Sequence, residues 1–237
     1  MGLALGPYPL EHYVPPLLGV GALDVKQVSG LTAVQILIAA SAGAWTHGRR
    51  NLVHRPLAIR GGIAMAVGSL IGSVGSHFVS GRLLLLVFAA MTTLAVPLMF
   101  IPPGNLGEWS APESVSVSLA KAMPAAAIIG CLAGFVGAGG AFLLMPVMIG
   151  LLRVPVRIGI ATSLVMTAAA AAVGLVGKVS TGQVPFGPAS AVAVGSIIGG
   201  VLGARVSRSA PVALLRGVLA ALVALVALRV WSDVLSP

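Results

Sequence analysis

The chain has 237 residues, of which 58% are hydrophobic and 8% are charged, and its mean hydropathy is +1.07. Since a soluble domain carries roughly 25% charged residues, this composition excludes a water-exposed globular surface and predicts an all-α polytopic membrane protein. The formal charge of +9 comes from basic residues at the ends of apolar stretches, a placement that membrane topology explains. Without aromatic residues interleaved among these basic residues, nucleic-acid binding is not expected.

Apolar stretches of about 17 to 25 residues, the length of a membrane-spanning helix, follow one another along the chain. The stretch 3–20 is a poorer candidate because it contains four prolines, and it also carries Glu11 and His12. The first twenty residues also lack the basic region with which a cleavable signal peptide begins. Transmembrane helices are expected at 29–46, 61–79, 83–101, 158–177, 184–204 and 210–228.

An uncharged run of 31 residues separates Lys121 from Arg153. At about 1.5 Å per residue, a helix of this length is too long for one span and too short for two. The run contains Gly137, Gly139 and Gly140, and glycine weakens a helix. We therefore expect one long and one short helix, separated by a break at these glycines.

The two halves of the chain resemble each other. The stretches "PLLGVGALDVKQVSGLT" and "PVMIGLLRVPVRIGIAT" have equal length and place Thr32 opposite Thr162. Further on, "GSLIGSV" from Gly68 matches "GSIIGGV" from Gly195. These matches predict an internal duplication, and chance likeness between small-residue helices is the alternative.

The loop 102–116 is the main polar interruption and is expected to link the two halves. We therefore predict a first transmembrane repeat with this linker over 1–116 and a second repeat over 117–237, together forming one membrane domain.

The loop 46–60 carries four arginines and is expected in the cytoplasm. If 122–152 crosses the membrane twice, nine basic residues share that side and four lie opposite, whereas a single crossing gives seven and six. The positive-inside rule favours the double crossing, which inverts the second repeat relative to the first.

A helix break inside the bilayer leaves backbone groups unpaired, at a cost of several kcal/mol each. We therefore expect the break at 137–140 near the membrane midplane, where protein or a water-filled cavity meets it. The following helix would present free amides and a positive dipole end, which suit an anion, and secondary transporters hold substrates at broken helices. The alternative is close helix packing, the role expected of Gly130 with Gly134 and of Gly195 with Gly199.

Several polar residues are further candidates for contact with a substrate. Thr32, Thr162 and Ser163 lie at matched helix starts, and Gln35 follows one turn after Thr32. Their side chains could bond an anion's oxygens, and bonding within their own helices is the alternative. The predicted substrate-binding residues are therefore Gly137, Gly139, Gly140, Thr162, Ser163, Thr32 and Gln35.

Two titratable residues near the N-terminus are candidates for proton coupling. At membrane depth Glu11 could carry a proton, and His12 titrates near neutral pH; a frayed terminus at the interface is the alternative. Arg216 lies inside the last expected span and is predicted to extend toward the cytoplasmic interface. No sequence cluster has metal-ligand spacing, and no phosphate-binding loop or nucleophile elbow occurs, so no cofactor, metal or enzyme activity is predicted.

The stretch "GFVGAGGAFLLMPVMIG" at 134–150 resembles the glycine-rich signature of the TauE/SafE sulfite exporter family. "RVPVRIGIATSLV" resembles the loop and helix start that follow it there, and "LDVKQVSGLTAVQ" fits the first half. The resemblance implies a plasma-membrane exporter of sulfite or a small organosulfur anion such as sulfoacetate. Family members usually carry a second glycine-rich break where this chain has "LGPYPLEHYVPPLLG", so the first repeat is expected to be atypical or truncated.

These patterns together predict a secondary transporter that moves a small anion across the bilayer by alternating access. A homo-oligomer is compatible with the sequence. The alternatives are a transporter of another solute, such as a carboxylate or a metal ion, and a non-transporting membrane scaffold. The scarcity of acidic residues in the spans argues against a bare divalent cation, and a scaffold has no need of a broken helix.

Overall fold

The computed structural model describes residues 24–48, 52–99, 117–209 and 212–235, which form helices and contain no strand. This confirms the all-α prediction. The helices are α1 (Val25–Gly48), α2 (Arg55–Gly75), the short 3-10 helix η4 (Ser76–Phe78), α3 (Gly81–Met99), α4 (Leu119–Val136), α5 (Ala141–Gly150), α6 (Val156–Ser180), α7 (Phe186–Ser209) and α8 (Val212–Leu235).

Every expected span falls on one of these helices. Among the described residues, four helical segments are long and apolar enough to cross a membrane: α1, α2 with η4, α4 and α6. Shorter apolar segments occur in α3, α5, α7 and α8. The uncharged run at 122–152 is divided as predicted into a long helix, α4, and a short one, α5.

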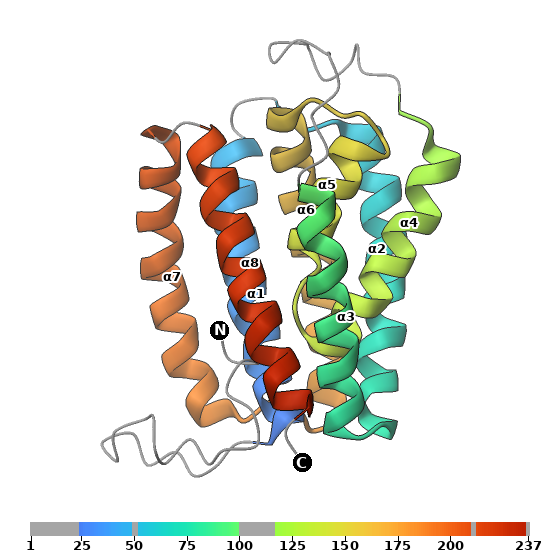
Figure 1. Cartoon of the computed structure of the whole chain (residues 1–237), viewed down its shortest axis with the longest axis vertical. Coiled ribbons are helices and arrows are strands. Elements are labelled where there is room, and N and C mark those ends of the chain that lie inside the picture. Colours follow the sequence, from blue (N-terminus) through green and yellow to red (C-terminus); the bar gives the residue numbers. More distant parts are fainter. Residues whose placement is uncertain (1–23, 49–51, 100–116, 210–211, 236–237) are drawn as a thin grey trace.

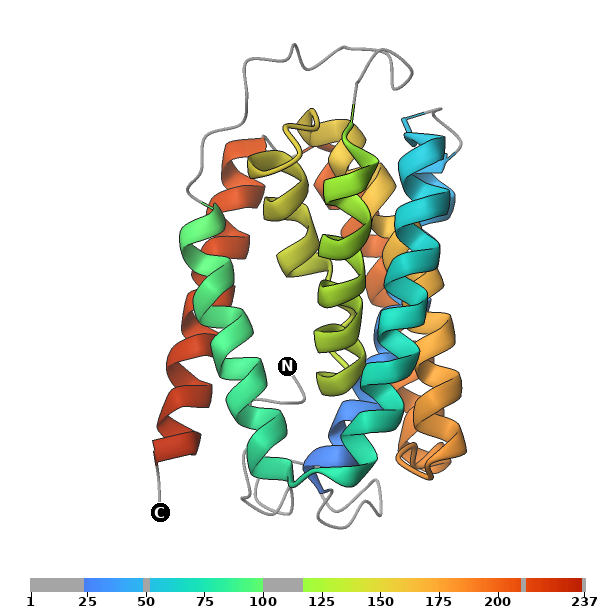
Figure 2. The ribbon, with the colours of Figure 1, turned by 90° about the vertical axis from the view of Figure 1, so that its right-hand side faces the viewer.

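The helices stand side by side, so that their ends gather at two ends of the bundle (Figure 1). We call the end where α1 finishes and α2 begins the upper end, and the opposite one the lower end. Helices α1, α3 and α7 run upward, whereas α2, α6 and α8 run downward (Figures 1 and 2). Helix α4 descends from the upper end and α5 returns to it, with the turn between them inside the bundle (Figure 2). Both ends of 122–152 thus lie at one end of the bundle, as a double crossing requires, but the run does not pass through to the lower end.

Helices at matched positions in the two expected repeats run in opposite directions. Helix α1 rises where α6 descends, α2 descends where α7 rises, and α3 rises where α8 descends (Figures 1 and 2). An inverted duplication requires this opposition. The inverted repeat itself, and the boundary placed in the loop 102–116, stay predictions.

Close packing of α2 on α4 depends on glycines in both helices. A methyl group at Gly68 would collide with the carbonyl of Ala127, and one at Gly134 would collide with that of Ser69. The backbones therefore touch, as small residues at helix interfaces allow. This confirms the packing role predicted for Gly130 and Gly134 but not for Gly195 and Gly199, which face open space among the described residues.

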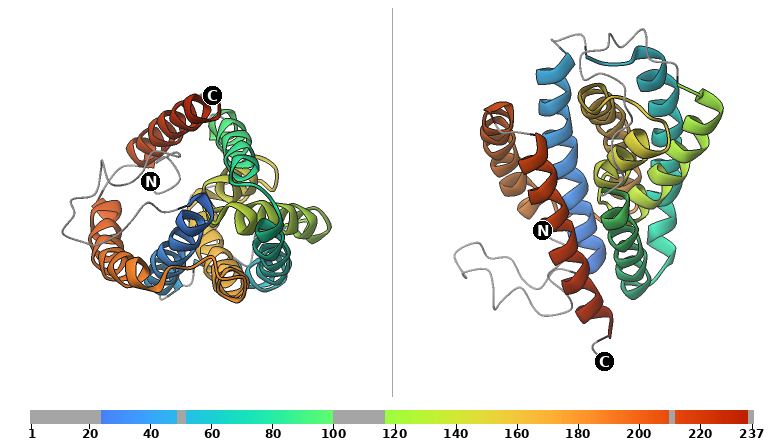
Figure 3. Two further views of the ribbon diagram at one scale, coloured as in Figure 1. Left: turned by 90° about the horizontal axis from the view of Figure 1, so that it is seen from below. Right: turned by 45° about the horizontal axis from the view of Figure 1, so that its top comes forward.

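Helices α3 and α8 lie together on one side of the bundle (Figure 3). The indole Nε1 of Trp231 on α8 donates to the hydroxyl of Thr93 on α3 at 2.9 Å. Helix α1 lies across from this pair and packs on α6 and α7, and α5 fits between α3 and α6. The short α5 thus lies between two groups of helices, α3 with α8 on one side and α1 with α6 and α7 on the other.

Candidate functional site

The residues Gly137, Ala138, Gly139 and Gly140, here called the glycine break, separate α4 from α5. The three glycines have φ angles of 78°, 68° and 65°, in the left-handed region that side chains disfavour and glycine adopts freely. The amides of Gly137 and Ala138 both donate to the carbonyl of Ala133, at 2.8 and 3.1 Å, which is how a left-handed glycine ends a helix. The predicted break is confirmed, and it lies inside the bundle away from both ends (Figure 2).

Each glycine of the break is closely covered by another part of the chain. Gly137 lies against the backbone and hydroxyl of Ser29, and Gly139 lies against the side chain of Ile36, both on α1. A methyl group at Gly140 would come within 2.9 Å of the Ala133 Cβ atom. Helix α1 therefore packs directly against the break. A movement of α1 must shift the backbone of the break, and the reverse also holds.

Helix α5 presents its amino end to the break. The carbonyl of Gly140 accepts from the amides of Leu143 and Leu144, at 3.1 and 2.8 Å. The amides of Ala141 and Phe142 precede the first intrahelical bonds and have no acceptor within α5. Free amides and the positive end of the helix dipole favour a negatively charged group at this position.

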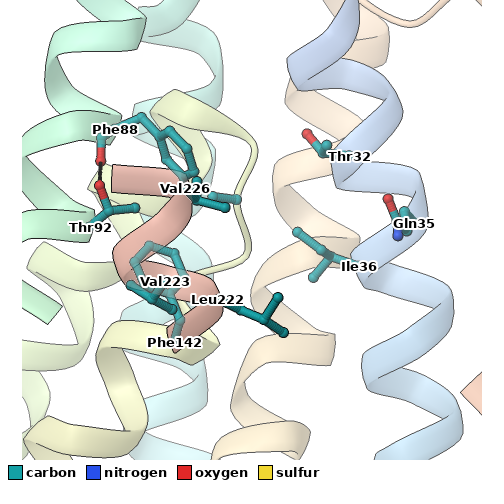
Figure 4. A pocket seen from close by; sticks show the side chains of 10 residues that line it. Thr32, Gln35, Ile36, Phe88, Thr92, Phe142, Leu222, Val223 and Val226 are labelled. Carbon is teal, nitrogen blue, oxygen red and sulfur yellow. Dashed lines mark hydrogen bonds between the residues drawn. The ribbon is translucent and has the colours of Figure 1, made fainter. Parts of the chain in front are cut away.

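A cavity of about 250 Å³ opens beside these amides, between α1, α3, α8 and the start of α5. In Figure 4, Thr32, Gln35 and Ile36 of α1 stand on one side, and the side chains of α3, α5 and α8 stand on the other. The volume lies just below the usual 300–1,000 Å³ of ligand pockets, so it suits a small solute. The described residues that line it are Thr32, Gln35, Ile36, Phe88, Thr92, Ala138, Phe142, Leu222, Val223 and Val226.

The polar groups in this cavity are neutral. The hydroxyl of Thr32 lies 3.1 Å from the carbonyl of Val28 and 3.0 Å from that of Ser29, so it donates within α1. The hydroxyl of Thr92 likewise donates to the carbonyls of its own helix. Since both protons are used locally, the Gln35 amide is the side-chain donor best placed to bind an anion.

The other two predicted hydroxyls lie elsewhere. Thr162 is fully buried in α6, where its Oγ1 accepts from the backbone N–H of His54 at 3.1 Å. The hydroxyl of Ser163 donates to the carbonyl of Ile160 at 3.0 Å. The structure thus brings Thr32, Gln35 and Ala138 of the glycine break together at one cavity. None of the other predicted residues, Gly137, Gly139, Gly140, Thr162 and Ser163, lines it.

Glu11 and His12, the residues proposed for proton coupling, lie outside the described residues. Arg216 lies on α8, but its side chain is also outside the described part of the structure. Where the structure is described, no group of three His, Cys, Asp or Glu residues could hold a metal ion.

One polar residue of the site was missed by the sequence analysis. The charge count places Lys178, just beyond the expected span 158–177, among the four basic residues opposite the cytoplasmic side, yet its side chain is only 1% exposed. Its ammonium Nζ lies 2.8 Å from the Ser76 hydroxyl, 3.1 Å from the Gln183 Oε1 and 3.2 Å from the Phe135 carbonyl. The signal available in the sequence is that Lys178 follows a run of small and apolar residues without any charge.

Lys178 lies beside the break in a second, much smaller space. It lines a space of about 10 Å³, here called the lysine niche, together with Ala33, Ile36, Gly137 and Gly139. Ile36 lines both the niche and the larger cavity. Ile36 is therefore a wall shared by the two spaces.

Comparison with known proteins identifies the family. The family model for "Sulfite exporter TauE/SafE" matches residues 13–230. The chain belongs to the TauE/SafE family. Two proteins from Xylella fastidiosa, strains Temecula1 and 9a5c, each called "Probable membrane transporter protein", are 28% identical to this TauE/SafE chain over 201 residues. The alignment covers 82% of this chain and 73% of each relative.

No solved structure matches this TauE/SafE chain significantly. The family and the names of the two relatives identify the protein as a membrane transporter with a small-solute substrate. They agree with the glycine break and with the apolar helices that the structure shows.

Proposed function

We propose that this transporter exports sulfite or a small organosulfur anion across the plasma membrane by alternating access, and that the anion binds at the glycine break. The observation that carries the proposal is the position of the cavity. The cavity of about 250 Å³ is lined by Ala138 of the break and by Phe142 in the first turn of α5, so it lies at the amino end of that helix. A broken helix that opens onto a cavity is the arrangement that secondary transporters use to hold a substrate.

The chemistry of this cavity favours an anion over a cation. Its described lining contains no carboxylate, and the helix dipole places positive potential at Ala141 and Phe142. The Gln35 amide can donate to a sulfite or sulfonate oxygen, while the apolar side chains of α3 and α8 accommodate a short carbon chain. The proposed role of Thr162 and Ser163 is to stabilise the helices around the site.

The arrangement of helices supports alternating access. Helices α3 and α8 form a pair on one side of the cavity, and α1 with its neighbours forms the other side (Figure 3). Rocking of one group against the other would open the cavity alternately toward the two ends of the bundle. Helices α1 and α6, which occupy matched positions in the two repeats, run in opposite directions, as an inverted-repeat mechanism of this kind requires.

The distribution of basic residues supports a cytoplasmic upper end. Arg55, Arg60, Lys121 and Arg153 belong to this end, whereas Lys26 and Arg82 belong to the lower one. By the positive-inside rule, the loop 46–60 is on the cytoplasmic side and the lower end faces outward. Glu11 and His12 are proposed to couple export to protons.

The test is transport by purified protein in liposomes. We expect sulfite uptake to be inhibited by excess sulfoacetate and much less by sulfate or acetate. Preference for acetate over sulfite would instead establish a carboxylate transporter. Absence of any anion-dependent flux in well-folded protein would favour a non-transporting scaffold and contradict the proposal.

A further inference from the structure

The environment of Lys178 fits an ammonium ion with all three protons donated. Its Nζ has three acceptors, the Phe135 carbonyl, the Gln183 Oε1 and the Ser76 hydroxyl, within 2.8–3.2 Å. The Ser76 hydroxyl donates its own proton to the Ser73 carbonyl at 2.6 Å, so it is left to accept from Nζ. Three neutral acceptors thus surround Nζ, one for each proton of an ammonium group.

No carboxylate of the described residues forms an ion pair with this ammonium. All three of its partners are neutral oxygen atoms. Lys26 adds a second positive charge at the same end, with its Nζ 2.8 Å from the carbonyl of His77. An ionisable side chain inside a membrane domain is costly and normally pairs with an opposite charge, and here that charge is missing from the described protein.

A second observation is a buried hydroxyl next to a glycine that lines the niche. Ser29 is fully buried, and within the described residues its hydroxyl has no hydrogen-bond partner. The hydroxyl faces Gly137, which also lines the lysine niche. A buried hydroxyl without a partner is rare in proteins, and the Ser29 hydroxyl can therefore bond a further polar group.

We propose that Lys178 and Ser29 form an anion-binding subsite behind the glycine break, whose ligand is the oxyanion group of the transported substrate. This inference rests on the proposed function, and it adds the counter-charge that the neutral cavity lacks. The niche of about 10 Å³ holds no more than one water molecule, so the subsite is closed in this state. It becomes accessible from the cavity when the break and Ile36 separate.

Gln183→Glu is the decisive variant. It places a carboxylate where an amide oxygen now lies 3.1 Å from Nζ, so the protein itself supplies the counter-ion. The variant keeps the bond to Nζ but loses the Nε2 donation to the Thr181 hydroxyl at 2.7 Å and to the Ser73 carbonyl at 3.5 Å, so its melting temperature is measured beside its flux. If Lys178 only fastens α6 to α4, folded Gln183→Glu protein transports normally. If the ammonium binds the substrate, the internal carboxylate competes with it, and sulfite flux in liposomes falls at least tenfold.

Gln27→Glu is the matched control because it adds the same charge at the same end of the bundle. The Gln27 Oε1 accepts from the amide of Asp24 at 3.1 Å and does not contact Lys178. We expect its flux to stay within twofold of the wild-type value. Flux of the Gln183→Glu variant within twofold of wild type would overturn the subsite.

Ser29→Ala provides a second test that does not depend on Gln183→Glu folding. Removing a hydroxyl that has no partner should leave the melting temperature unchanged or higher, while the KM for sulfite rises about fivefold. An unchanged KM in folded Ser29→Ala protein would also overturn the subsite.

Anion-dependent thermal stabilisation separates this inference from the proposed function. Wild-type protein that gives no flux, but is stabilised by sulfite in a way that Gln183→Glu abolishes, would keep the subsite and refute transport. Wild-type flux with a normal Gln183→Glu variant would refute the subsite and keep transport. Neither flux nor stabilisation would refute both.

Discussion

The carbonyl of Phe135, one residue before the end of α4, accepts a hydrogen bond from the ammonium of Lys178 on α6, with 3.2 Å between oxygen and Nζ. This bond joins the lower part of α6 to the helix that leads into the glycine break. The free carbonyls at the end of α4 carry partial negative charge, so an ammonium stabilises them. The geometry of the break is thus held from two directions, by α1 through Ser29 and Ile36 and by α6 through Lys178.

The covering of Gly137 by Ser29 leads to a prediction about stability. Gly137→Ala should lower the free energy of unfolding by a left-handed backbone cost of roughly 1–2 kcal/mol plus an overpacking cost of about 1–3 kcal/mol. Gly182→Ala is the matched control, because Gly182 has a similar φ of 68° but open space around it. Reversible unfolding in detergent measures both, and equal losses would show that Ser29 does not constrain the break.

The contact between α2 and α4 gives a second prediction. A methyl group at Gly72 would collide with the Cys131 carbonyl, whereas one at Gly75 meets nothing within 4 Å. Gly72→Ala should therefore destabilise the protein by about 1–3 kcal/mol, and Gly75→Ala should be neutral or stabilise it by up to about 1 kcal/mol. Thermal unfolding of both variants checks the ranking, and the reverse order would contradict the close approach of these helices.

Thr162 provides a third prediction because its hydroxyl accepts from the His54 amide. Thr162→Val removes this acceptor and should cost about 1–3 kcal/mol of stability, with the KM for the transported anion unchanged. Thr167→Val is the control on the same helix, since the buried Thr167 hydroxyl has no partner within the described residues. We expect Thr167→Val to be neutral or stabilising. A raised KM in Thr162→Val would place Thr162 at the substrate.

The path of α4 and α5 predicts the sidedness of labelling. In a Cys131→Ala background, cysteines at Lys121 and Arg153 should react with an impermeant thiol reagent from one side of the membrane. Cysteines at Ser80 and Ser180, which lie at the lower end, should react from the other side. Labelling of positions 121 and 153 from opposite sides would rule out the returning path.

Much of the fold could be predicted from the sequence because the bilayer restricts how long an apolar helix can be. The division of 122–152 follows from run length and from Gly137, Gly139 and Gly140, and the structure confirms it. The same run length cannot tell which side of a helix faces a cavity. Thr32 and Thr162 occupy matched positions, yet Thr32 lines the cavity and Thr162 bonds to the start of α2.

Lys178 was missed for a different reason. Charge counting assigns every basic residue near the end of a span to a loop, and the expected span ended at residue 177. Helix α6 continues to Ser180, and the turn at Gly182, with φ 68°, brings Gln183 back onto Nζ. A contact made by three segments that are distant in the sequence leaves no local pattern from which to predict it.

The central claim, that a small anion binds beside the glycine break, is tested most directly by protection of a cysteine at Gln35, which lines the cavity. In the Cys131→Ala background, we expect maleimide to label Gln35→Cys in purified protein, and we expect saturating sulfoacetate to slow that labelling at least fivefold. Sulfoacetate is the probe because sulfite itself reacts with maleimide. A cysteine at Arg153 should show no protection. Labelling of Gln35→Cys at the same rate with and without sulfoacetate, in protein that transports it, would contradict the placement of the site.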